Sequence, residues 1–230
     1  MSTATEGFVA IEIDRTLAQG MGLPARRIVV SSIGARRVVD GEGRIDLEAL
    51  ADEADAVLSA EDRRVAIHHQ APTVARVALF ASRLADREGR FDDALRLATM
   101  ATAWAPQDLE CVAARSIAQA RVGRHDDALF GYMEVLEGDS DGVATGLRVL
   151  AVRSALEADR PLLARRLAEP LRGTWEREPE ALTRLLAAID QAVGAGEPEP
   201  ETPADWYPDP TGAARLRYWD GAEWTDHTAE

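Results

Sequence analysis

A stretch that occurs twice decides the fold: residues 82–97 read SRLADREGRFDDALRL, and residues 116–131 read SIAQARVGRHDDALFG. Ser, Arg, Gly, Arg, Asp, Asp, Ala and Leu recur in place, with an offset of 34 residues. Self-similarity at a fixed period of roughly 20–50 residues is the signature of stacked structural repeats. The period therefore predicts an array of similar units.

The matched residues predict that each unit is a pair of helices. Gly89 and Gly123 suit the end of a first helix, where a residue with a positive φ is favoured. Asp92 suits the start of the next helix, because a carboxylate there faces the free N–H groups and the helix dipole. Ala94 is small where paired helices approach most closely, and the second copy has the same residue types at these places.

The 34-residue period and this pattern resemble tetratricopeptide repeats, and Pro106 stands where that family commonly has a proline. The second repeat departs from the family at Arg115 and Gln119, where apolar residues are usual. A third unit, with Asp159 in its turn and Ala164 in its helix, fits only with about two residues inserted. The resemblance implies a helical array over residues 46–193, with repeats at 75–108, 109–142 and 144–179 and a capping helix at 180–193.

The residues before the repeats divide into two parts. Residues 46–60 have apolar side chains at helical spacing and begin with Asp46, so they predict a capped amphipathic helix. A second helix over 59–70, ending before Pro72, would pair with it and extend the stack. Residues 1–45 are different, because their β-branched runs predict a small β-meander with strands at 8–13, 27–32 and 36–40. A flexible arm or an oligomerisation strand is the alternative for this segment.

The end of the chain has its own composition. Residues 194–204 read GAGEPEPETPA, which predicts a linker. Residues 205–230 hold three of the five tryptophans and predict a small β module. Asp220-Gly221 lies between two β-rich runs and predicts a two-residue hairpin turn. The segment 206–208 contains a proline, so we expect it to lie across the hairpin as an extended or edge segment.

This terminal segment is similar to Domain of Unknown Function 2510, a short module common in actinobacterial proteins. The similarity rests on aromatic residues, prolines and glycines that match in order between Asp205 and Thr228. It implies a fold and a lineage but no activity. Two interpretations of the aromatic rings remain open: they form a peptide-binding surface, or they are the core of the module. The residues concerned are Trp206, Tyr207, Tyr218, Trp219 and Trp224.

Composition and motifs argue against several classes of function. The formal net charge of −14 repels nucleic acid at long range and favours a basic partner. The sequence lacks the common phosphate-binding, dinucleotide-binding, hydrolase and metal motifs, so we expect no catalytic site, cofactor or metal. His68 and His69 are adjacent, and adjacent side chains on a helix point about 100° apart. Cys111 is the only cysteine, and we expect it to be buried and structural.

No stretch reaches the roughly 20 apolar residues of a membrane span, and the N-terminus lacks the features of a secretory signal. A cytoplasmic location without membrane association is therefore expected. The leading functional prediction is a non-enzymatic scaffold or adaptor that binds a protein or peptide partner in the groove of the array. The alternative is a structural subunit of a homo-oligomer or larger assembly.

The resemblance to tetratricopeptide arrays also implies which residues face the groove. Arg76 and Arg83 either bind an acidic group of the partner or pair with acidic neighbours in the chain. The positions that the family pattern assigns to the groove are Arg76, Leu79, Arg83, Asp86, Glu110, Ala113 and Ile117.

Overall fold

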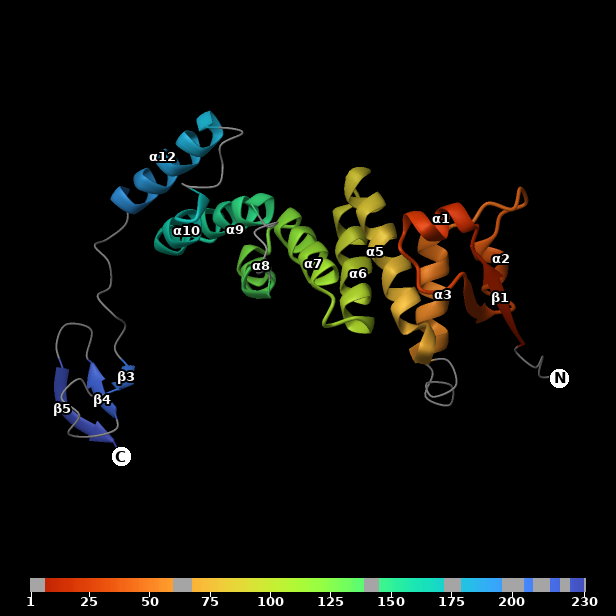
Figure 1. Ribbon diagram of the computed structural model, residues 1–230, viewed down its shortest axis with the longest axis horizontal. Coiled ribbons are helices and arrows are strands. Elements are labelled where there is room, and N and C mark those ends of the chain that lie inside the picture. The colour runs from red at the N-terminus through yellow and green to blue at the C-terminus, as the bar shows by residue number, and fades with distance from the viewer. Residues whose placement is uncertain are drawn as a thin grey trace. The chain divides into compact units, whose positions relative to one another are not determined.

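The computed structural model describes residues 7–59, 68–138, 145–171, 179–195, 205–208, 216–219 and 224–229. The chain divides into two compact units, Met1–Ile189 and Asp190–Glu230. The described residues are mainly helical, with a short two-stranded antiparallel sheet near the N-terminus, as the fold class predicted (Figure 1).

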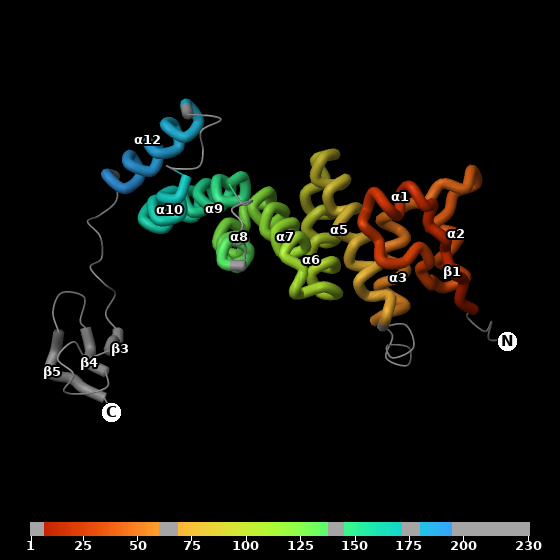
Figure 2. The backbone as a smooth tube through the Cα atoms, viewed as in Figure 1, coloured from red at the N-terminus to blue at the C-terminus, as the bar shows by residue number. Residues whose placement is uncertain are grey.

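The first unit contains three consecutive helix pairs. Neighbouring helices in the chain contact each other, and α5, α7 and α9 also contact one another in turn (Figure 2). The array is thus built as two layers of alternating helices. The pairs are α5 (Ala71–Arg87) with α6 (Phe91–Trp104), α7 (Leu109–Arg121) with α8 (His125–Gly138), and α9 (Thr145–Glu157) with α10 (Pro161–Ala168).

The turns within the three pairs have the same geometry. Gly89, Gly123 and Asp159 adopt φ values of 76°, 80° and 56°. In each turn, the N–H of the following arginine donates to the carbonyl five residues earlier, at 2.9, 2.9 and 2.8 Å. Such a bond closes the end of a helix that terminates in the left-handed conformation. The turns therefore confirm the predicted helix pairs and the extra two residues of the third unit.

Small residues set the distance between paired helices. Ala94, Ala128 and Ala164 are each 0% exposed, as predicted for the positions of closest approach. Gly131 in α8 faces α7 so closely that a Cβ atom there would clash with the Ser116 Oγ. The Ser116 hydroxyl donates to the Val112 carbonyl at 2.9 Å, so its polar atom is satisfied within its own helix.

The N-terminal part confirms two of the three predicted strands. β1 (Phe8–Glu12) pairs with β2 (Arg27–Ser31) in antiparallel register without a shift. Between them lies α1 (Arg15–Gly20), a helix that the sequence interpretation missed. Asp14 caps α1, because its Oδ1 accepts the N–H of Thr16 at 2.8 Å. This bond and the Leu17 N–H lower the pKa of the Asp14 carboxyl.

The third predicted strand, at 36–40, is wrong. Residues Ala35–Val38 instead form the short helix α2. The Ser31 Oγ accepts the N–H of Gly34 at 2.9 Å, which starts a tight turn directly after β2. The turn buries Val38 completely, and the chain then makes only an isolated bridge from Val39 to Ile45.

The predicted helix at 46–60 is confirmed as α3 (Leu47–Ser59), capped by Asp46. It packs on α5 and contacts α6, and the Trp104 Nε1 donates to Asp55 at 2.7 Å. Of the helix expected over 59–70, residues 60–67 lie outside the described residues, and His68–Gln70 form the 3-10 turn η2. Pro72 lies in the first turn of α5 and does not end a helix.

A helix, α12 (Pro179–Ala195), lies where a capping helix was predicted, and its Leu185 and Ile189 are buried. Within the part of the chain that the structure describes, no helix has both the length and the apolar character needed to cross a membrane.

The C-terminal unit contains a three-stranded antiparallel sheet. Its order is β3 (Asp205–Pro208), β4 (Leu216–Trp219) and β5 (Trp224–Ala229), so β3 is an edge strand as predicted. The predicted turn at Asp220-Gly221 lies outside the described residues, and the nearest described pair on the two strands is Trp219 with Trp224. The β4–β5 register shifts between Arg217 and Trp219.

Candidate binding groove

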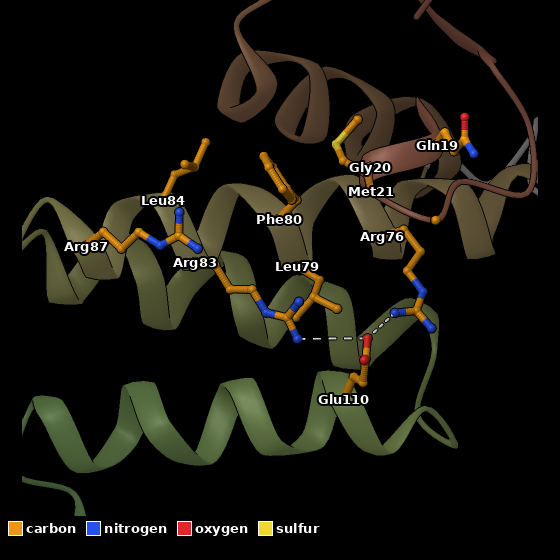
Figure 3. Close-up of a pocket in the computed structure, with 11 residues that line it drawn as sticks. Gln19, Gly20, Met21, Arg76, Leu79, Phe80, Arg83, Leu84, Arg87 and Glu110 are labelled. Carbon is orange, nitrogen blue, oxygen red and sulfur yellow. Dashed lines mark hydrogen bonds and ion pairs between the residues drawn. The ribbon is translucent and has the colours of Figure 1, made fainter. Parts of the chain in front are cut away.

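A pocket of about 420 Å³ lies between α1, α5 and α7 (Figure 3). The end of α1 and its turn contribute residues 19–22, and α7 contributes Glu110. Helix α5 contributes most of the lining, because residues three, four and seven positions apart share one face of a helix. Its lining residues are Arg76, Leu79, Phe80, Arg83, Leu84 and Arg87.

Arg76 is held by ion pairs within the chain. Its Nη2 lies 2.9 Å from the Asp108 carboxylate, and its Nη1 donates to Glu110. Asp108 in turn caps α7 by accepting the N–H of Glu110 at 3.0 Å. The guanidinium therefore joins α5 to the start of α7. Of the two interpretations left open for Arg76, the structure supports pairing with acidic neighbours within the chain.

Arg83 and Arg87 are held much less. Arg83 lies 3.8 Å from Glu110, which is a distant ion pair already shared with Arg76. Arg87 forms no ion pair with any residue that the structure describes. Figure 3 shows Arg83 pointing toward α7 and Arg87 extending along α5 toward the middle of the pocket. Both side chains are exposed, so both can reach a bound group.

A second pocket, of about 250 Å³, adjoins the first and shares Arg83, Arg87 and Glu110 with it. We call the two pockets together the groove. The structure brings five of the residues that the repeat pattern assigned to the groove together along the second pocket: Arg83, Asp86, Glu110, Ala113 and Ile117. The far wall is small and apolar, because α6 and α7 supply several alanines there.

Two further residues predicted for the groove are held by contacts within the chain. Leu79 is 2% exposed and belongs to the core, so only the floor of the pocket is available there. Asp86 pairs with Arg121 at 3.3 Å, and the Arg121 guanidinium lies 5.7 Å from the centre of the Phe91 ring. Such a stacked cation is held in place on both sides. Asp86 therefore lies beside the groove with its negative charge neutralised by Arg121.

Sequence reasoning missed Arg87, Phe80 and the α1 turn around Met21. Helical spacing could have identified Arg87, because it follows Arg83 by four residues and such residues share one face of a helix. The α1 turn had no such signal, because nothing in its sequence indicates which distant helix it contacts.

The structure also shows the surroundings of the other titratable side chains. No group of three or more His, Cys, Asp and Glu residues is placed to hold a metal within these parts of the chain. Cys111 is 0% exposed, as expected, and burial raises the pKa of its thiol to about 11. Burial likewise raises the pKa of Tyr132 to about 12, although a hydrogen bond with Ser154 opposes this.

The aromatic residues of the C-terminal unit occupy neighbouring register positions. Trp206 lies opposite Tyr218, Tyr207 lies opposite Arg217, and Trp219 lies opposite Trp224. The strand pairing thus brings the predicted aromatic positions together on one small sheet.

Comparisons with known proteins concern this last unit. The family described as "Protein of unknown function (DUF2510)" matches residues 204–230. No curated protein matches the chain. No solved structure matches it. The family match supports the predicted C-terminal module and does not extend to the helical array.

Proposed function

We propose that the chain is a non-enzymatic protein–protein interaction scaffold whose groove binds an acidic peptide segment of a partner. The observation that carries this proposal is the pair Arg83 and Arg87, which are exposed, lie one helical turn apart and line both pockets. An arginine without a strong internal partner is suited to a carboxylate, because its N–H groups bind two oxygens at once.

The surroundings of the two arginines favour a peptide over a small ion. Phe80 and Leu84 lie on one side of them, and Ala113 and Ile117 lie on the other. A peptide with alternating acidic and apolar residues would place carboxylates on the arginines and apolar side chains on these walls. Peptide sites combine apolar pockets and a few charged contacts in this way.

Three finer assignments belong to this proposal. The helix pairs are tetratricopeptide-like, which the 34-residue period and the identical left-handed turns support. The C-terminal module is a second recognition element, with its aromatic residues as the contacts. The scaffold works in the cytoplasm, a proposal supported by its lone, unpaired and buried cysteine.

Fluorescence anisotropy tests the groove with two labelled peptides, each about ten residues long. One alternates Glu and Leu, and the other alternates Lys and Leu. We expect the Glu peptide to bind the wild type more tightly. Arg83→Ala plus Arg87→Ala should weaken its binding at least about tenfold, because two charge-assisted hydrogen-bonding groups are lost. Glu110→Gln should tighten binding, since it removes the carboxylate that competes for Arg83.

The matched control is Arg165→Ala plus Arg166→Ala, which makes the same change in net charge on α10, away from the groove. This variant should bind like the wild type. The proposal fails if neither peptide binds, if the Lys peptide binds equally well, or if the control weakens binding as much as the groove variant.

A further inference from the structure

Helix α8 has an exposed face that is centred on a phenylalanine. Phe130 is 78% exposed, and Met133, about one helical turn later, is 37% exposed. At about 100° per residue, all the exposed positions among residues 125–137 fall within about 60° of Phe130. The side chains that α8 buries lie on the other side of the helix. We call the exposed set the α8 face; it consists of Asp126, Asp127, Phe130, Met133, Glu134 and Glu137.

The repeat shows that Phe130 is not needed for the helix pair. The residue 34 positions earlier is Arg96, which is exposed and pairs with Asp52 of α3. The counterpart of Met133 is Thr99, which is also exposed and polar. These positions therefore lie at the surface in both repeats, and only the second repeat fills them with large apolar side chains. Isolated apolar residues are common on surfaces, but here two of them are neighbours on one face.

Unpaired negative charge lies beside the two apolar side chains. The aspartates in the first turn of α8 are already neutralised, at 2.8 Å by Arg160 and at 2.7 Å by Arg124. Glu134 and Glu137 are exposed and form no ion pair with any residue that the structure describes. They follow Phe130 by four and seven residues, so they share its side of the helix. The α8 face thus combines an apolar centre with available carboxylates.

We propose that the α8 face binds a basic amphipathic helix of a partner protein. Apolar side chains of that helix would cover Phe130 and Met133, and its Lys or Arg side chains would pair with the two glutamates. Amphipathic helices are recognised through such apolar anchors one turn apart, and aromatic residues and Met are enriched in interfaces. This surface goes beyond the proposed function, because it lies on a different helix from the arginines of the groove and selects the opposite charge.

Charge decides between the possible occupants of the α8 face. In a two-fold pair of copies the same face would meet itself, so the glutamates of both copies would approach one another. The formal charge of −14 on each copy adds to this repulsion. An anionic membrane surface would be repelled for the same reason. A basic helix is attracted both by the whole chain at long range and by the glutamates on contact.

Fluorescence anisotropy on the full chain tests the apolar centre with two labelled peptides of about 15 residues. In one, Leu and Lys recur at helical spacing and occupy opposite sides of the helix; the other has the same composition in scrambled order. We expect the first peptide to bind more tightly. Phe130→Ser plus Met133→Gln should weaken its binding at least about tenfold, because the apolar anchors are lost.

The fold should survive this double change. Each replacement has a helix propensity close to that of the original residue, so circular dichroism should retain its helical signal. The matched control is Ile33→Ser, which removes an apolar side chain that is 61% exposed elsewhere on the chain. This control should bind the amphipathic peptide like the wild type.

A second pair of variants tests the carboxylates. Glu134→Gln plus Glu137→Gln should weaken binding about threefold at about 20 mM salt and by less at about 200 mM, because exposed ion pairs are screened. Glu12→Gln plus Glu42→Gln makes the same change in net charge in the N-terminal part of the chain and should bind like the wild type. Equal weakening by the two pairs would show that only net charge attracts the peptide and would overturn the assignment of Glu134 and Glu137.

Other outcomes overturn the proposal as a whole. They are a wild type that binds neither peptide, one that binds both equally, and an Ile33→Ser control as weak as the Phe130 variant. Sedimentation velocity that finds a dimer of the 24.9 kDa chain, lost in the Phe130 variant, would make a second copy the occupant. Binding to phosphatidylserine vesicles that is lost in the same variant would make it a membrane. None of these results bears on Arg83 and Arg87, so the groove stands or fails separately.

Discussion

At the scale of single residues, the burial of Cys111 has a measurable consequence for alkaline stability. Burial raises its thiol pKa from 9.0 to about 11, so the folded state favours the neutral thiol. The stabilisation is complete below pH 9, where the thiol is protonated in both states. It is lost as the pH rises through about 11, because the unfolded chain then releases the proton more readily.

We therefore expect the wild type to lose more stability than Cys111→Ala between pH 7.5 and 10.5. Urea unfolding at the two pH values measures this difference. Tyr132, whose pKa is raised to about 12, is present in both proteins and cancels in the comparison. Identical pH dependence in the two proteins would show that the thiol does not titrate in this range.

The candidate groove shows what residue spacing can and cannot predict. Arg76 and Arg83 are seven residues apart, so the sequence placed both on one face of α5. The two arginines differ in how strongly they are paired, because Asp108 and Glu110 of the next helix pair contact Arg76 closely. Whether an arginine is available or paired depends on such contacts between helices, and a single sequence does not report them.

At the scale of the elements, exchanging Asp and Gly between the three turns tests whether backbone strain at positive φ affects stability. Gly89 and Gly123 have no Cβ penalty at positive φ, whereas Asp159 adopts φ 56° with a side chain. Asp159→Gly should raise the free energy of unfolding by about 0.5–1 kcal/mol, since relief of this strain exceeds the added entropy of the unfolded chain. Gly123→Asp should lower it by a similar amount.

Urea unfolding of the two variants checks the signs. Asp93→Gly, outside any turn with positive φ, is the control and should destabilise the first turn of α6. If Asp159→Gly and Gly123→Asp both stabilised the chain, or if neither did, then φ at these turns would not govern the stability of the array.

The elements also differ in how well the sequence predicted them. Turns and helices of the repeats were predicted because glycine and alanine recur at a fixed period. The strand expected at 36–40 was wrong because Val38 and Val39 satisfy a β pattern locally, while Ser31 starts a helical turn that buries Val38. The helix α1 was missed although Asp14 precedes it as a cap, because six residues offer too short a pattern to recognise.

At the scale of the whole molecule, the groove and the net charge act in opposite directions. The chain carries a formal charge of −14, yet Arg83 and Arg87 offer positive charge in one place. An acidic peptide is therefore repelled at long range and attracted on contact. Salt reduces both effects, but the long-range field is screened more strongly, since the Debye length is about 10 Å at 0.1 M.

Stopped-flow measurements with the Glu–Leu peptide separate the long-range repulsion from the attraction on contact. Raising the salt from about 20 to about 200 mM should increase the association rate, because repulsion during approach is screened. The same change should increase the dissociation rate, because the arginine contacts weaken. An association rate that falls with salt would show that the local arginines dominate the approach of the peptide.

The hydrogen bond from Val29 in β2 to Gln70 has a consequence, which concerns how the N-terminal sheet could meet another strand. A sheet edge with unpaired backbone groups can recruit further strands and grow into a fibre. At Val29 the outward N–H of β2 already donates to the Gln70 Oε1, and Gln70 is 5% exposed. A strand that paired with β2 at this position would therefore first have to displace a buried side chain.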